Sequence, residues 1–175
     1  MKMLRNWRNN SGQALIEFMF VAAMLLLLVF GLIDFCRAIF TRQVITNLTR
    51  EGANLVSRNT TITNAAAAVI ASASPLDINA HGRVIISVVT NNGGVAIVAD
   101  QLSQGGISTN TVTSKVAPGG IGSIAKMPST TPLQLPQSNQ TVYVTEVYYD
   151  FHAITPVGQF LGFTLPPQLY DVAFF

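Results

Sequence analysis

The sequence predicts an α+β fold in which one long N-terminal helix carries a small antiparallel sheet. Two observations predict this class. An apolar run lies near the N-terminus, with no charged residue between Phe18 and Ile33. The second half of the chain instead holds β-branched and alternating segments separated by Gly and Asn, a pattern typical of strands joined by tight turns.

The composition favours an exported or assembled subunit over a free cytosolic enzyme. The 175 residues are 49% hydrophobic and 10% charged, against a usual charged fraction of about 25%. Charge is scarce after the apolar run as well, where Thr, Asn, Ser, Gly and Ala dominate. The net charge is +2, and basic residues form no stripe interleaved with aromatic ones. We therefore expect no nucleic-acid partner.

The apolar run predicts a transmembrane helix at 13–35. The sixteen residues from Phe18 to Ile33 rise about 24 Å as a helix, close to the roughly 30 Å of a hydrocarbon core. Glu17 lies inside this helix. A carboxylate costs on the order of 2.5–3.5 kcal/mol at a bilayer centre and less near an interface, so Glu17 is expected to have a partner.

The outer end of this helix carries a pair of opposite charges. Asp34 and Arg37 are three residues apart, on one helix face, which permits an ion pair. We interpret the pair first as a marker of the membrane interface and second as a subunit contact. Cys36 is the only cysteine, so no internal disulfide can form. It is either a small apolar side chain at the membrane edge or one half of an intermolecular disulfide.

Residues 1–12 are expected to be a basic leader that is cleaved. They contain Lys2, Arg5 and Arg8 and no acid. A secretory signal peptide is the alternative, but the apolar run exceeds the usual 7–15 residues and no clear Ala-x-Ala site follows it. Arginines on both sides of the run leave the charge count tied, so charge alone does not set the orientation.

The start of the helix resembles a known processing site. Gly12, followed by Gln13-Ala14-Leu15-Ile16 and then Glu17-Phe18, is similar to the cleavage site of type IV pilin-like precursors. The wider stretch over about residues 8–56 includes Leu32-Ile33-Asp34-Phe35-Cys36-Arg37-Ala38 and Thr49-Arg50-Glu51-Gly52-Ala53. It resembles the TadE-like pseudopilins of tight-adherence pilus systems.

This resemblance implies a function and a location. A prepilin peptidase would cleave after Gly12, with Gly12, Gln13, Glu17 and Phe18 forming the processing site. The new α-amino group of Gln13, typically methylated in related pilins, would then pair with Glu17 within or between subunits. Other implied partners are pilins or pseudopilins, an inner-membrane assembly platform and membrane lipid. The chain would be a single-pass protein of the bacterial inner membrane, with its N-terminus cytoplasmic and its C-terminal domain extracytoplasmic.

The rest of the chain predicts the helix extension and a pilin-like domain. Residues 36–58 read as an amphipathic extension of the first helix, with Phe40, Val44, Leu48, Leu55 and Val56 along its apolar side. Residues 59–175 form the exoplasmic α+β domain. In it we expect a short second helix from the Thr61 cap to about Ser72, and the predicted strands are 83–89, 95–99, 141–151 and 168–175.

A Gly-, Pro-, Ser- and Thr-rich loop is predicted at 103–140. It is too long for an ordinary connection, so it is either a functional excursion or poorly ordered. Its composition offers little apolar area to offset the entropy of ordering, and we expect proteases to cut it first, at Lys115 or Lys126.

No enzymatic motif emerges, and we expect neither a catalytic site, a cofactor nor a metal. The sharpest constellation is Glu146, Asp150 and His152, at alternate positions of one strand, which we interpret as a solvated strand face. The sequence therefore predicts a non-enzymatic pseudopilin, or minor pilin, needed for assembly of a tight-adherence pilus or a related secretion machine. The alternative is a membrane-anchored extracytoplasmic binding or enzymatic domain in which Gly-x4-Glu is coincidental.

Overall fold

A computed structural model describes residues 11–127, 140–160 and 166–175, and it confirms the α+β class. The predicted leader at 1–12 lies almost entirely outside these residues. The elements, in chain order, are α1 (Ser11–Ser57), α2 (Ile62–Ser72), α3 (Ile78–His81), β1 (Gly82–Asn92), β2 (Val95–Gly105), β3 (Thr141–Asp150), α4 (Pro156–Phe160) and β4 (Gln168–Phe174). The described residues fall into two compact units, one comprising 11–37 with 153–160 and the other 38–127 and 140–152 with 166–175.

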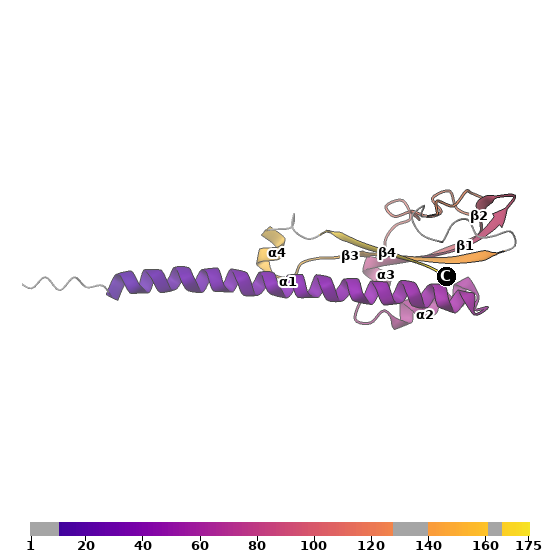
Figure 1. Ribbon diagram of the computed structural model, residues 1–175. Coiled ribbons are helices and arrows are strands. Elements are labelled where there is room, and N and C mark those ends of the chain that lie inside the picture. Colours follow the sequence, from indigo (N-terminus) through magenta and orange to yellow (C-terminus); the bar gives the residue numbers. More distant parts are fainter. Residues whose placement is uncertain (1–10, 128–139, 161–165) are drawn as a thin grey trace, which may run out of the picture. The chain divides into compact units, whose positions relative to one another are not determined.

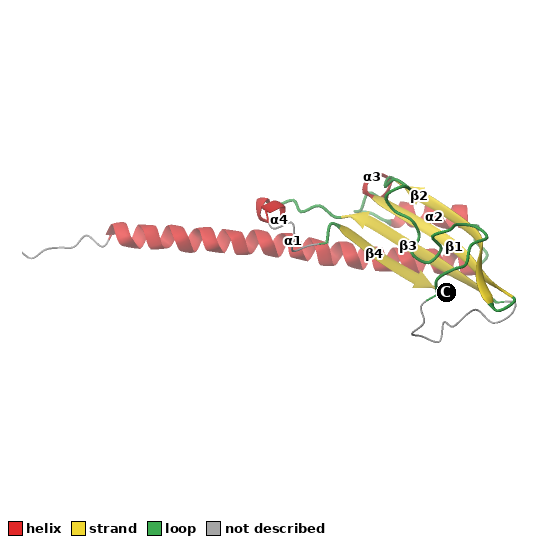
Figure 2. Cartoon of the chain, turned by 90° about the horizontal axis from the view of Figure 1, so that it is seen from above, coloured by secondary structure: helices red, strands yellow, loops and turns green. Residues whose placement is uncertain are grey.

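The four strands form one antiparallel sheet in the order β2-β1-β3-β4 (Figures 1 and 2). The hairpin between β1 and β2 turns through Gly93 and Gly94, whose φ angles are 63° and 88°. Two successive positive φ angles are what a type I′ turn requires, and Gly adopts them without steric cost. The two glycines thus fix the register in which Asn92 pairs with Val95.

One face of the sheet packs on the C-terminal half of α1 and on α2. The buried residues of α1 recur at helical spacing: Ala38, Thr41, Ile45, Leu48, Thr49, Ala53 and Val56. Thr61 caps α2 by accepting a hydrogen bond from the Asn64 N–H at 3.3 Å. The prediction for Phe40 was wrong, because this side chain is 51% exposed. Phe40 lies on a different side of the helix from the buried Thr41 and Ile45.

Residues 106–127 cover the other face of the sheet. They contain no helix or strand, yet they bury Ile107, Val112, Val116, Ala117 and Ala125. Val116, Ala117 and Ala125 join an apolar cluster with strand residues, while Ile107 and Val112 pack in a second cluster with Ile85 and Tyr148. The domain therefore has three layers: helices, sheet and this covering segment, hereafter the 106–127 segment.

This covering layer corrects the prediction for 103–140. Strand β2 continues through Gly105, so the first three residues are strand and not loop. The 106–127 segment is packed, because an apolar side chain every few residues supplies the buried area that its Gly and Ser content lacks. The remaining part of the prediction, 128–139, lies outside the described residues.

Candidate functional site: the exposed half of α1

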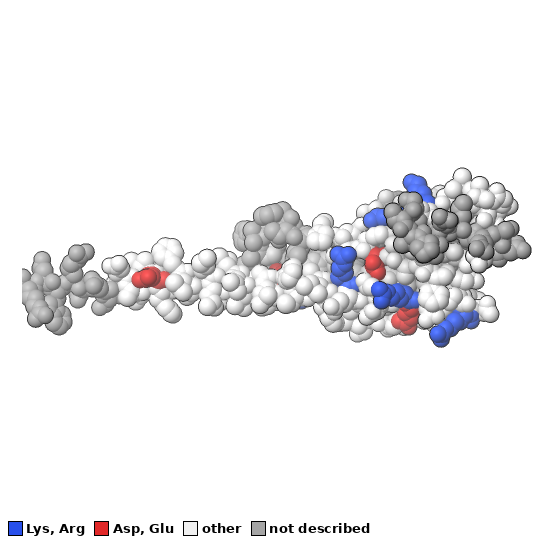
Figure 3. Space-filling view, in the orientation of Figure 1, with Lys and Arg blue, Asp and Glu red and all other residues white. Residues whose placement is uncertain are grey.

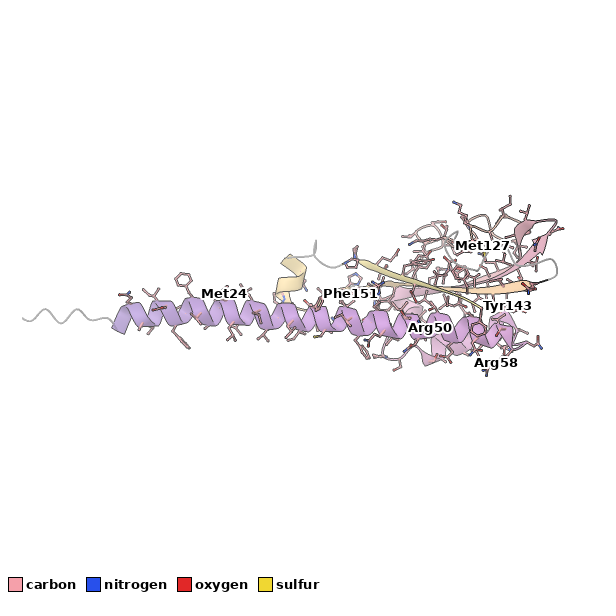
Figure 4. All side chains as sticks on the ribbon, viewed as in Figure 1. Met24, Arg50, Arg58, Met127, Tyr143 and Phe151 are labelled. Atoms are coloured by element: carbon pink, nitrogen blue, oxygen red, sulfur yellow. The ribbon has the colours of Figure 1, made fainter. Side chains whose placement is uncertain are left out.

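The N-terminal half of α1 is an apolar helix that is exposed along its length. Among the described residues, α1 is the one helix long and apolar enough to cross a membrane, and none of its most apolar stretch is buried. Met24, labelled in Figure 4, is 75% exposed. Figure 3 shows Lys, Arg, Asp and Glu concentrated over the sheet and the C-terminal half of α1, whereas the N-terminal half is almost free of them. Lipid tails or other apolar helices are the surroundings that such a surface requires.

The predicted processing residues all lie on the first two turns of this helix. Gly12, Gln13, Glu17 and Phe18 are exposed. Within the described ranges, no atom lies within 4 Å of where a Cβ on Gly12 would sit, so none of these residues covers the backbone there. Gln13 and Glu17 are four residues apart and therefore share a helix face. Glu17 has no hydrogen-bond or ion-pair partner within the described part of the chain.

Asp34, by contrast, is occupied inside its own chain. It is 1% exposed, and its Oδ1 accepts hydrogen bonds from the backbone N–H groups of Ile154 at 3.1 Å and Thr155 at 3.4 Å. The hydroxyl of Thr155 donates to Oδ2. The sequence predicted Asp34 and Arg37 as subunit contacts. Arg37 is exposed and interacts electrostatically with Asp34, whose carboxylate also accepts hydrogen bonds from residues far along the sequence.

The exposed apolar half of α1 begins at Ser11, and Glu17 is its one acidic residue between Gly12 and Ile33, without a partner among the described residues. Residues 12–54 match the TadE-like protein family. No curated protein and no solved structure matches the chain. The match spans the exposed apolar half of α1 and most of its C-terminal half. This likeness suggests a pilin-like protein associated with tight-adherence pili.

Outside the segment that matches the TadE-like family, the most deeply buried charged residue among those described is Glu146 of β3. It is fully buried, so the expectation of a solvated strand face was wrong at this residue. Its Oε1 accepts hydrogen bonds from the Lys115 backbone N–H at 2.8 Å and the Tyr170 hydroxyl at 2.9 Å, and its Oε2 accepts one from the Ser114 hydroxyl. Two of these donors belong to the 106–127 segment, so the carboxylate ties that segment to the sheet.

Two tyrosines and a lysine complete the surroundings of Glu146. The rings of Tyr148 and Tyr170 lie 4.7 Å apart, and the Lys115 Nζ lies 3.7 Å from the Tyr170 ring centroid, within cation–π range. Burial, and then the charge of Glu146, raise the pKa of both tyrosines above the usual value. The tyrosines thus stay neutral, and the Tyr170 hydroxyl donates to the carboxylate.

The three residues of the strand constellation are not brought together. Asp150 accepts a hydrogen bond from the Gln168 side chain at 3.0 Å, and the His152 ring lies 6.0 Å from that of His81. No group of three or more His, Cys, Asp or Glu within the described ranges could hold a metal ion. The oxygens of Glu146 are already taken by donors of the chain itself. The network therefore has a structural explanation.

Sequence reasoning missed the partners of Asp34 and Glu146. For Asp34, the sequence does indicate that its partner Thr155 starts a helix. Thr155-Pro156 combines a preferred N-cap residue with proline at the first helical position, and α4 begins at Pro156. No local signal pairs Glu146 with Ser114 and Lys115, because the contact depends on how the 106–127 segment folds back over β3.

Proposed function

We propose that this protein is a membrane-anchored pseudopilin, or minor pilin, that is cleaved after Gly12 by a prepilin peptidase. It is then incorporated into, or primes, a tight-adherence pilus or a related secretion machine. The TadE-like match and the exposed apolar half of α1 support this proposal. The chain would be held in the inner membrane with its N-terminus cytoplasmic and its sheet domain extracytoplasmic.

The observation that carries the proposal is the isolation of Glu17. An apolar helix that crosses a membrane gains nothing from a carboxylate, which favours protonation or a partner. Glu17 has no partner within the described part of the chain. We therefore infer that its partner belongs to another molecule or is the new N-terminus that cleavage creates. Cleavage after Gly12 would create a cationic α-amino group on Gln13, one helical turn before Glu17.

That amine can meet Glu17 in two ways. Within one subunit the two groups have the i, i+4 spacing of a helix-surface pair. Between subunits, the Glu17 of one helix meets the terminal amine of its neighbour, and the pair sets the axial register of the two helices. In the second arrangement, the charge of Glu17 is neutralised only when the subunits assemble. Other pilins or pseudopilins and an inner-membrane assembly platform are the partners that this mechanism requires, with Arg37 as a further exposed contact.

The test is the mature N-terminus, measured by mass spectrometry of the protein from cells that contain the pilus system. We expect a chain that begins at Gln13. Gly12→Leu should leave the precursor uncleaved, because a bulky side chain would cover the scissile backbone. Gly31→Leu is the matched control, since neither glycine has an atom within 4 Å of its Cβ position. An intact or differently cut terminus in the unaltered chain would favour a membrane-anchored binding or enzymatic domain instead.

A further inference from the structure

A short segment of the C-terminal half lies against the outer end of the membrane helix. Residues 153–158, hereafter the Asp34-bound segment, follow β3 and contain the first turn of α4. They belong to the same compact unit as the N-terminal part of α1. Ile154 and Thr155 both donate backbone hydrogen bonds to Asp34. Ile154 therefore lies at the level of residue 34, where the predicted membrane helix ends.

Three backbone donors of this segment have acceptors within the chain. Asp34 accepts the N–H groups of Ile154 and Thr155. Thr155 in turn accepts the Gly158 N–H through its hydroxyl oxygen at 3.2 Å and the Gln159 N–H through its carbonyl oxygen, also at 3.2 Å. Pro156 has no N–H to satisfy. Irregular backbone is excluded from lipid because unpaired donors are costly there, and each of these pairs lowers the cost of placing the segment at the membrane boundary.

The surface left by these contacts is apolar. Burial of the Asp34 carboxylate removes its charge from the surface of α1. Ile154 is 60% exposed, and Ile33 and Phe35, which flank Asp34 on α1, are 41% and 54% exposed. An exposed isoleucine that is hydrogen-bonded through its backbone to a membrane helix extends the apolar surface of that helix sideways. This apolar surface lies next to Arg37, which is exposed three residues after Asp34, and the combination of apolar and cationic side chains fits the boundary between headgroups and acyl chains.

We propose that the Asp34-bound segment is a second membrane-contacting element, and that Ile154 inserts into the outer headgroup and acyl boundary of the bilayer. Asp34 is the positioning residue, because it holds the segment against α1. The inference rests on the proposed membrane anchor and adds to it, since a single helix leaves the attached chain free to tilt and rotate. A second contact beside the helix restricts that motion at the membrane surface.

Spin labels on the full chain in vesicles of phosphatidylethanolamine and phosphatidylglycerol test this. The only cysteine is first replaced by Cys36→Ser, and Ile154→Cys, Ile121→Cys and Leu28→Cys are then labelled one at a time. Ile121 is the matched control, an isoleucine of the sheet domain that is 64% exposed. We expect the label at 154 to collide more with oxygen, which concentrates in lipid, and the label at 121 more with a water-soluble nickel complex.

The three labelled positions distinguish a failure of the second membrane contact from a failure of the proposed membrane anchor. If positions 154 and 121 both report water while position 28 reports lipid, the second contact is overturned and the anchor stands. If position 28 also reports water, the proposed anchor fails with it. Asp34→Ala should move the label at 154 towards water and leave the labels at 28 and 121 unchanged. A label at 154 that stays in lipid in Asp34→Ala would overturn the positioning role of Asp34.

A second variant tests the same contact from the other side. A Cβ on Gly158 would lie 2.5 Å from the Ala153 Cβ and would also collide with Asp34 Oδ2. Gly158→Ala should therefore displace the segment and shift the label at 154 in the same direction as Asp34→Ala. No shift in Gly158→Ala would show that the segment is not held as described.

Discussion

Gly52 of α1 lies so close to Thr145 of β3 that a Cβ on Gly52 would sit 2.8 Å from the Thr145 Cγ2. Gly52 is buried and Thr145 is fully buried, so neither can move into solvent. The glycine lets the helix backbone approach the sheet, and it lies inside the segment that matches the TadE-like family. This approach joins the helical layer to the centre of the domain.

We expect Gly52→Ala to destabilise the domain although alanine is the better helix former. Overpacking of a filled core costs about 1–3 kcal/mol, more than the roughly 1 kcal/mol that alanine gains in a helix. Gly31→Ala, where a Cβ meets open space, should not destabilise it. Denaturant unfolding of both variants in detergent measures the difference. Equal stability of the two variants would mean that the core accommodates a methyl group at position 52, and that Gly52 is not needed for the close approach of helix and sheet.

The same contact predicts a stabilising change. The Oγ1 of Thr145 is buried and has no hydrogen-bond partner in the part of the chain that the structure describes. A buried hydroxyl without a partner costs about 1–3 kcal/mol, so Thr145→Val should leave the free energy of unfolding unchanged or raise it. The nearby Thr49→Val is the contrast, because the Thr49 hydroxyl lies 3.0 Å from Asp171 Oδ2. A clear loss of stability in Thr145→Val would show that the hydroxyl has a partner.

The buried carboxylate of Glu146 predicts where proteases cut. Glu146→Ala leaves Ser114, the Lys115 N–H and Tyr170 without their acceptor, at about 1–3 kcal/mol for each donor that stays buried. The 106–127 segment should then open, and trypsin should cut after Lys115 faster than in the unaltered chain. Asp150→Ala is the matched control, since Asp150 lies on the same strand but is not buried. Rapid cutting at Lys115 in the unaltered chain would contradict the packing described above.

The raised pKa values of Tyr148 and Tyr170 predict a loss of stability in alkali. An unfolded tyrosine ionises near pH 10, whereas these two stay protonated in the folded chain because burial and Glu146 oppose the phenolate. The stabilisation is complete below about pH 10 and is lost as pH rises towards the folded pKa, by up to about 1.4 kcal/mol per pH unit for each tyrosine.

Circular dichroism and tyrosinate absorbance, followed from pH 8 upward, check this prediction. The absorbance change of the two tyrosines should coincide with unfolding. The double variant Tyr148→Phe, Tyr170→Phe should show a shallower loss of stability above pH 10, although it is less stable at neutral pH through its lost hydrogen bonds. An unchanged alkaline slope in the double variant would assign the effect to other groups.

Local sequence signals predicted much of this fold for physical reasons that can be named. The two glycines at 93 and 94 specify the hairpin, and Thr61 caps α2 as its sequence context indicates. What local pattern could not supply is contact between distant segments. Thr49 reaches Asp171 and Asp34 reaches Thr155 across more than a hundred residues. Such pairings depend on how strands and helices are assembled and leave no periodic trace.

The composition of the 106–127 segment led to the wrong prediction of a poorly packed loop. Its Gly, Pro, Ser and Thr content is typical of a loose loop, and the few apolar residues look too sparse to pack. Their spacing matters more than their number, because Ile107, Val112 and Val116 all reach one face of the sheet. The exposed apolar half of α1 was easier to predict, since the run of apolar residues is visible in the sequence itself, while the processing role of Gly12 and Glu17 stays a prediction.

The last prediction concerns Glu17, whose removal separates membrane insertion from assembly. Glu17→Val should leave insertion intact or slightly improve it, because it deletes a carboxylate that costs up to about 3 kcal/mol in lipid. The same change should impair incorporation into the pilus, since the Gln13 amine of a neighbouring subunit would lose its partner and the helices their register. Cleavage, membrane fractionation and pilus assembly must be measured separately.

Leu15→Val is the control, because Leu15 is an exposed apolar residue on the same helix. Normal assembly of Glu17→Val would rule out the pairing, and loss of cleavage alone would assign Glu17 to peptidase recognition.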